Sequence, residues 1–410
     1  MTGPIPTDPL EGAVLDGRYL VETKIATGGM STVYRGMDNR LDRPVALKVM
    51  DSRYSGDEQF LSRFRLEARA VARLKNPGLV AIYDQGMDGR HPFLVMELVE
   101  GGTLRELLRE RGPMPPHAVT AVLRPVLGGL AAAHRAGLVH RDVKPENVLI
   151  SDDGDVKLVD FGLVRAVAEA GITSTSVILG TAAYLSPEQV ASGTSDPRSD
   201  VYSVGVLTYE LLTGTTPFGG DTALAVAYQR MDQDVPAPST RIDGVPPQFD
   251  ELVLRATSRD AAGRYLDAAD MAAALDRIAG ELALPMFRVP APQNSAQHAS
   301  AALHDSRIHD ERTTEKRARP PAAPPVLPVR HPTKAMTRGP DDWQEPAGTA
   351  GRPEYPAAAG QFAGIEIDEF TWARQRARRM TLVWVALILI LTGAVAGAAW
   401  ALGSHLTSLL

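Results

Sequence analysis

The sequence predicts an α+β fold with two lobes, because strand-like and helix-like patterns are separated along the globular part of the chain. The first part contains short β-like runs, at Tyr19–Val21, Val45–Val49 and Phe93–Met96. Helical patterns dominate afterwards, at Thr103–Arg111, His117–Ala136 and Asp200–Leu212. The region from 15 to 279 spans roughly 265 residues, the upper edge for a single core. We therefore expect a β-rich N-lobe and a helical C-lobe with a cleft between them.

Composition excludes several classes of function. The chain has 410 residues and a net charge of −6, which argues against nucleic-acid binding because that usually needs a basic face. It contains no cysteine, so disulfides, zinc–thiolate sites and thiol catalysis are excluded. Residues 1–30 lack a basic start followed by an apolar run, so we expect no secretory signal peptide.

One eight-residue stretch carries most of the chemical information: His140-Arg141-Asp142-Val143-Lys144-Pro145-Glu146-Asn147, with Asp160-Phe161-Gly162 following 13 residues later. Asp142 can accept a proton from a substrate hydroxyl, and Lys144 can neutralise charge on a phosphate as it moves. Asn147 and Asp160 offer the hard oxygen ligands that Mg²⁺ prefers. Each alone could be an ordinary turn-capping residue. Their joint spacing predicts phosphoryl transfer from ATP with Mg²⁺, or Mn²⁺ in its place.

A glycine-containing turn between two β-like segments is a second candidate for contact with phosphates. Its cofactor-binding residues are Ala26, Thr27, Gly28, Gly29, Met30 and Val33. On its own an ordinary hairpin would be the better interpretation, since Ala26 and Ser31 stand where glycines are usual. Lys48 ends an alternating apolar strand nearby, and Glu67 on the helical pattern Phe60–Leu74 can pair with it. That pair would aim Lys48 at the α- and β-phosphates.

Met96, Glu97 and Val99 follow a strand and precede Gly101 and Gly102. The pattern is typical of a hinge whose backbone groups hydrogen-bond adenine, with Met96 at the back of the pocket. The alternative is that these apolar residues belong to the core, and for Met96 both interpretations hold, because pocket walls are core residues too.

The stretch between Asp160 and Ser186-Pro187-Glu188 contains four adjacent hydroxyl residues, Thr173 to Ser176. They could form a plain flexible loop. In a phosphotransferase of this kind, phosphorylation would order such a loop by pairing with an arginine, for which Arg141 is the obvious candidate. Two supporting roles are also expected: Glu188 would form a buried pair with Arg264, and Asp200 would brace the catalytic loop.

Together these residues resemble the Hanks-type (eukaryotic-like) serine/threonine protein kinases, and Gly28–Ser31 and Gly180–Glu188 resemble the bacterial members. With its proline-rich tail, the whole chain looks most like the transmembrane members found in actinobacteria. The resemblance implies the bilobal protein kinase fold and a non-specific serine/threonine kinase that phosphorylates proteins. It also implies activation by autophosphorylation at Thr173 and Thr175.

Two other functions compete with this interpretation. A pseudokinase scaffold would bind partners without catalysis, but such proteins typically lose residues equivalent to Lys48, Asp142 or Asp160, and all three are present. A small-molecule kinase of similar fold is disfavoured by the phosphorylatable loop that ends in Ser186-Pro187-Glu188.

The remainder of the chain divides by composition. Residues 1–14 form an N-terminal arm, 15–279 the kinase domain, and 280–379 a proline-rich juxtamembrane linker with a basic end. Between 284 and 364 lie 13 of the 31 prolines, with little apolar periodicity, so we expect this stretch to be mostly disordered. Its four histidines, His298, His304, His309 and His331, are interpreted as solvated rather than metal-binding.

Residues 380–403 contain no charged side chain and predict one transmembrane helix, since 24 helical residues span about 36 Å. Four arginines precede it, at 374, 376, 378 and 379, and none follows. The positive-inside rule therefore predicts a single-pass cell-membrane protein with a cytoplasmic kinase domain and an outside tail at 404–410. Gly393 and Gly397 allow close helix packing, so a homodimer through this helix and the kinase domain is expected beside contact with membrane lipid. Small residues are also simply common in membrane helices.

Overall fold

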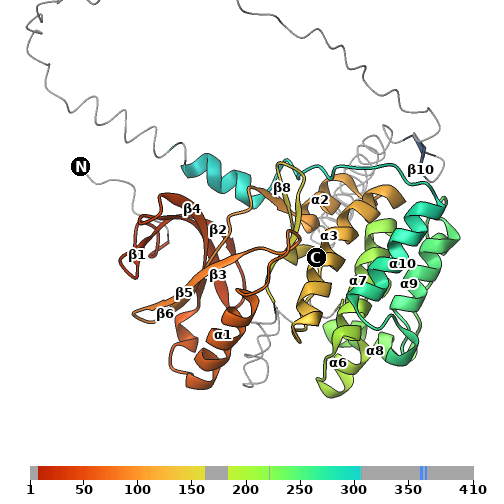
Figure 1. The fold of residues 1–410 in the computed structure, drawn as a ribbon, viewed down its shortest axis with the longest axis horizontal. Helices are drawn as coiled ribbons and strands as arrows, with labels where there is room; N and C mark the ends of the chain where they lie inside the picture. Colours follow the sequence, from red (N-terminus) through yellow and green to blue (C-terminus); the bar gives the residue numbers. More distant parts are fainter. Residues whose placement is uncertain are drawn as a thin grey trace, which may run out of the picture.

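In the computed structural model the described residues are 8–161, 183–220, 222–304, 306, 361–362 and 365–366. A strand-rich lobe lies beside a helical lobe, as the sequence predicts (Figure 1). Outside the two lobes, the described strands β10 (Gln361–Phe362) and β11 (Ile365–Glu366) pair with each other. Among these described residues no helix is both long and apolar enough to cross a membrane. The expected span at 380–403 lies outside them.

The N-lobe is a six-stranded antiparallel sheet in the order β1-β2-β3-β4-β6-β5. Its strands are β1 (Val14–Leu15), β2 (Tyr19–Thr27), β3 (Ser31–Asp38), β4 (Arg43–Met50), β5 (Ile82–Asp88) and β6 (His91–Met96). The two-residue period of β4 sends Val45, Leu47 and Val49 into one apolar cluster. Ala46 and Met50 join a second cluster on the opposite face. Lys48 shares that second face and therefore points into the cleft.

Helix α1 (Glu58–Val71) packs on this second face of the sheet. Asp57 caps it by accepting a hydrogen bond from the backbone N–H of Phe60 at 2.9 Å. The buried side chains of α1 lie on one stripe, at Phe60, Leu61, Phe64, Ala68 and Val71. Most of this stripe belongs to the N-lobe cluster, but Val71 packs into the large cluster of the C-lobe. The position of α1 is thus tied to both lobes.

The C-lobe is built from helices around one large core. Its helices are α2 (Leu104–Arg111), α3 (Pro116–Arg135), α6 (Pro187–Ser192), α7 (Pro197–Thr213), α8 (Ala223–Asp232), α9 (Pro247–Ala256) and α10 (Ala268–Glu281). Helices α3, α7, α9 and α10 supply most of that core. Helix α7 is buried along nearly its whole length, so it forms the centre of the lobe.

A three-stranded sheet, β7-β8-β9, connects the lobes and holds the catalytic loop. Strand β7 (Gly101–Thr103) follows the hinge, β8 (Val148–Ser151) begins directly after Asn147, and β9 (Val156–Leu158) ends just before Asp160. Gly101 has φ +145°, and a Cβ there would lie 2.0 Å from the carbonyl oxygen of Ile150. Only glycine permits β7 to approach β8 this closely.

The structure differs from the sequence prediction where a mostly disordered linker was expected to begin at residue 284. Residues 284–304 run from α10 back across both lobes and end in a helix at 296–304 (Figure 1). Val289, Ser295 and Ser300 are buried there. His298 stays partly exposed, and its Nε2 lies 2.9 Å from Asp152 Oδ1 in a surface contact. Much of this segment is held by polar contacts. Residues that make such contacts do not produce an apolar periodicity, so no pattern in the sequence indicates that the segment folds.

Candidate active site

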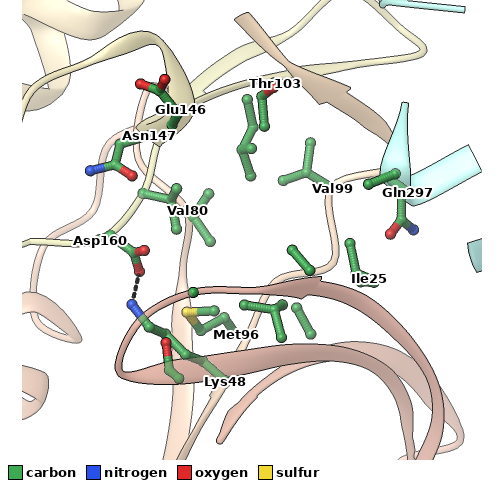
Figure 2. A pocket seen from close by; sticks show the side chains of 18 of the residues that line it. Ile25, Lys48, Val80, Met96, Val99, Thr103, Glu146, Asn147, Asp160 and Gln297 are labelled. Carbon is green, nitrogen blue, oxygen red and sulfur yellow. Dashed lines mark ion pairs between the residues drawn. The ribbon is translucent and has the colours of Figure 1, made fainter. Parts of the chain in front are cut away.

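A cavity of about 560 Å³ lies between the lobes, within the size range of small-molecule sites. It brings together fourteen of the predicted site residues: Ala26, Thr27, Gly28, Gly29, Met30, Val33, Lys48, Met96, Glu97, Val99, Asp142, Lys144, Asn147 and Asp160. Figure 2 shows that Lys48, Asn147 and Asp160 line one end, whereas Ile25 and Val99 line the other. The cavity therefore has a charged end and an apolar end.

At the charged end, the catalytic loop gathers two polar side chains around the carboxylate of Asp142. Lys144 Nζ lies 2.8 Å from Asp142 Oδ2. The Asn147 carboxamide nitrogen donates to the same Oδ2 at 3.0 Å and to the backbone oxygen of Asp142 at 2.8 Å. These contacts fix the orientation of the carboxylate. Because the amide nitrogen of Asn147 is used in this way, its carbonyl oxygen is the atom that a cation would meet.

Buried polar groups also fix the backbone of the catalytic loop, at His140 and Arg141. Asp200, fully buried, accepts hydrogen bonds from the backbone N–H groups of His140 at 2.8 Å and Arg141 at 2.7 Å. This confirms the expected bracing role of Asp200. Burial lowers the pKa of His140, so its ring is neutral. Its Nε2 donates to the carbonyl oxygen of Val159 at 3.0 Å, which leaves Nδ1 to accept from the backbone N–H of Asp142.

Lys48 and Asp160 form an ion pair of 2.6 Å inside the cleft. Burial alone would raise the pKa of Asp160, but the charge of Lys48 and its hydrogen bond outweigh this and lower it, so Asp160 is an anion. Asp160 has φ +67°, a backbone conformation that is uncommon outside glycine and turns the carboxylate towards the lysine. Strain of this kind is often found at functional sites.

The sequence predicted a different partner for Lys48, namely Glu67. Glu67 lies on α1 as expected, but it does not line the cavity, and the pair it was expected to form with Lys48 stays a prediction beside the observed pair with Asp160. The buried ammonium of Lys48 needs a nearby carboxylate, and Asp160 supplies one from the same cavity.

The hinge is fixed through the side chain of Glu97. Its carboxylate accepts hydrogen bonds from Lys157 Nζ at 2.6 Å and from the backbone N–H of Ala81 at 3.2 Å. The side chain is thus engaged with Lys157 and Ala81. Glu97, Leu98 and Val99 line the cavity. That backbone groups at Glu97 and Val99 bind a base stays a prediction.

The expected pair of Glu188 and Arg264 is present behind the site. Arg264 Nη1 and Nη2 lie 2.8 and 2.9 Å from the two carboxylate oxygens of Glu188. Partial burial would raise the pKa of Glu188, but hydrogen bonds from Arg264, Ser199 and Ser186 lower it from 4.5 to about 2. This two-point contact joins α6 to the segment before α10.

Several lining residues were missed from the sequence. Thr103 and Glu106 form a capping box at the start of α2, and the Thr-x-x-Glu spacing could have revealed them. Ala296 and Gln297 also line the cavity, and no sequence signal pointed to them. The loop with Thr173 and Thr175 lies outside the described residues.

Comparison with known proteins agrees with this geometry. The protein kinase domain family matches residues 19–266, which is more than half of the chain. This chain belongs to the protein kinase family. It is 72% identical over 403 residues to the serine/threonine-protein kinase PknL of Mycobacterium tuberculosis, with 98% of each chain covered.

Other kinases match a smaller share of the chain. The serine/threonine-protein kinase PknB of Mycobacterium leprae is 43% identical over 269 residues, which is 64% of this chain and 43% of that protein. Among solved structures, the kinase domain of PknI from Mycobacterium tuberculosis aligns with a TM-score of 0.51 at 26% identity. That alignment covers 65% of this chain and 98% of the PknI domain.

Proposed function

We propose that this protein kinase transfers the γ-phosphoryl group of ATP to serine and threonine hydroxyls of proteins. The observation that carries the proposal is the convergence of Asp142, Lys144, Asn147, Lys48 and Asp160 at one end of a single cavity. The identity of 72% with a serine/threonine kinase over nearly the whole chain supports the substrate class. The pseudokinase alternative finds no support, because none of these side chains is missing or displaced from the cleft.

The residues suggest a clear division of roles. Asp142 accepts the proton of the substrate hydroxyl as its oxygen forms the bond to the γ-phosphorus and the bond to the bridging oxygen of ADP breaks. The contacts of Asp142 with Lys144 and Asn147 hold its carboxylate still, so orientation supplies much of its benefit. Lys144 also neutralises charge on the transferred group.

The other end of the nucleotide would be held by Lys48 and by the hinge. Lys48 contacts the α- and β-phosphates, while the hinge backbone at Glu97 and Val99 meets the adenine between the apolar walls. The anionic Asp160 and the carbonyl oxygen of Asn147 fit Mg²⁺, which prefers such oxygen ligands and would neutralise phosphate charge. Mn²⁺ has similar preferences and could serve in its place.

Anchoring and regulation belong to the same proposal. The uncharged span at 380–403 with arginines before it would place the kinase on the cytoplasmic side of the cell membrane, in contact with lipid. Membrane anchoring would raise the local concentration of kinase, so that one copy phosphorylates Thr173 and Thr175 of another. Gly393 and Gly397 would allow the two spans to associate as a homodimer.

Mass spectrometry after incubation with Mg²⁺ and ATP tests the central proposal. The purified chain should acquire phosphate on serine or threonine, both on itself and on a generic protein substrate. Asp142→Asn keeps a group of the same size but removes the base, so this control should acquire none beyond the background. Equal incorporation by both chains would contradict the assigned role of Asp142.

A further inference from the structure

The segment that follows α10 contributes a wall to the cleft between the lobes. It lies directly on the hinge region, since a Cβ on Gly102 would fall 2.5 Å from Pro292 Cγ and 2.6 Å from Ser295 Cβ. The hydroxyl of Ser295 donates to the carbonyl oxygen of Gly101, and the backbone N–H of Ala296 donates to Glu106 Oε1 at 2.9 Å. The segment is therefore seated on the same residues that border the cavity.

The same segment also reaches the N-lobe. Ser300 is buried, and its hydroxyl lies 2.7 Å from the buried hydroxyl of Thr23 on β2. On the C-lobe side, the backbone N–H of Gln293 donates to Glu110 Oε2 at 2.8 Å. Contacts at both ends fix the first turn of the helix at 296–304 over the cavity.

Gln297 lies in this first turn, at the wall of the cavity. It lines the cleft and is only 6% exposed, yet neither its Oε1 nor its Nε2 has a hydrogen-bond partner within the described part of the chain. Buried amide groups are nearly always paired, because leaving them unpaired is costly. An unpaired amide at the wall of a cavity is therefore a candidate to hydrogen-bond a ligand there.

The position of Gln297 indicates which part of a ligand it would meet. Figure 2 shows it on the side of Ile25 and Val99, opposite the charged end that holds Lys48 and Asp160. The charged end suits phosphates, so the far end is left for the base and sugar. Both oxygens of nearby Glu106 already accept hydrogen bonds, from Ala296 and from Thr103. An amide supplies both a donor and an acceptor to sugar hydroxyls or a base edge.

We propose that Gln297 is a nucleoside-binding residue, supplied to the active site by the segment beyond the kinase domain. The inference rests on the proposed function, since it takes ATP as the ligand of the cleft. The cavity retains about 560 Å³ with Gln297 in place, which leaves room for a nucleotide beside it. The segment thus completes the site and does not block it.

Binding measurements on the full-length chain test this assignment with three probes: ATP, adenosine and inorganic tripolyphosphate, each with Mg²⁺. Gln297→Ala should weaken ATP and adenosine by about 3- to 10-fold, the worth of one hydrogen bond, and leave tripolyphosphate unchanged. Gln293→Ala is the matched control, because Gln293 lies in the same segment with an exposed side chain. Ser300→Ala should weaken adenosine in the same direction by loosening the segment.

Each other outcome has a definite meaning. Unchanged adenosine affinity in Gln297→Ala refutes the contact, and tighter ATP binding shows that the segment obstructs the cleft. Equal weakening of all three probes, or a lowered unfolding temperature without nucleotide, assigns Gln297 a structural role and overturns the inference. An unsubstituted chain that fails to bind ATP would refute the proposed function itself, and with it this inference.

Discussion

Replacing Arg264 by methionine should destabilise the C-lobe strongly. The Arg264 side chain is fully buried and makes five hydrogen bonds, two to Glu188 and three to the backbone oxygens of Ser258, Arg198 and Arg259. Removing one partner of a buried ion pair typically lowers the free energy of unfolding by about 3–5 kcal/mol, because the other charge is left buried without a partner. The pKa of Glu188, lowered from 4.5 to about 2, corresponds to about 3 kcal/mol. We expect a fall in the unfolding temperature on the order of 10 °C.

Thermal unfolding at pH 7 measures this effect, with Arg259→Met as the matched control. Arg259 also pairs with a carboxylate, Asp234 at 2.6 Å, but both side chains are largely exposed. Such a surface pair is worth about 0–1 kcal/mol. Equal shifts in the two variants would refute the reasoning. Adding Glu188→Gln to Arg264→Met should cost little more, because the carboxylate has already lost its partner.

The same pair has a pH dependence whose sign follows from the lowered pKa. The stabilisation by Glu188 is fully present above its unfolded pKa of about 4.5 and is lost as the pH falls through the folded value of about 2. The difference in stability between the unsubstituted chain and Arg264→Met should therefore shrink between these two values. A difference that stays constant across this range would assign the effect to packing alone.

Three further predictions concern the proposed function. Lys48→Met should keep the fold but lower phosphoryl transfer by several orders of magnitude, because the phosphates lose their oriented cation; an autophosphorylation rate near that of the unsubstituted chain would contradict the nucleotide site. Gly393→Ile should weaken self-association of the 380–403 span in a membrane association assay. Unchanged association would contradict the proposed helix contact through Gly393 and Gly397. The double variant Thr173→Ala, Thr175→Ala should lose much of its activity towards a protein substrate while still binding ATP, since no phosphate then orders the loop; full activity, or phosphate found only between 284 and 364, would exclude this switch.

The sequence predicted those parts of the site that depend on short stretches of chain. Asp142 and Asn147 lie five residues apart on one loop, so their distance of 3.0 Å follows from local geometry. Lys48 reaches the cleft because the period of a strand decides which face it occupies. The three strands and four helices that were named from periodicity are all present, with ends that differ by up to six residues.

What could not be predicted depends on how distant segments pack. The ion pair between Lys48 and Asp160 joins residues 112 positions apart and was not among the expected contacts. The folding of 284–304 onto both lobes depends on contacts such as that between Thr23 and Ser300, which are 277 residues apart. Such polar contacts between distant residues have no periodic pattern, and the proline-rich composition pointed to disorder instead.

The segment after α10 changes the mechanics of the whole molecule. With the hinge alone, the two lobes would be joined by one covalent strand about which they could twist. The contacts of Ser295 with Gly101 and of Ser300 with Thr23 add a second tie that runs alongside the first. Two parallel ties resist twisting and leave opening and closing as the easier motion. A chain cut just after α10, which ends at Glu281, would keep the helices of the core but lose this tie, so its two lobes would twist more freely than those of the intact protein.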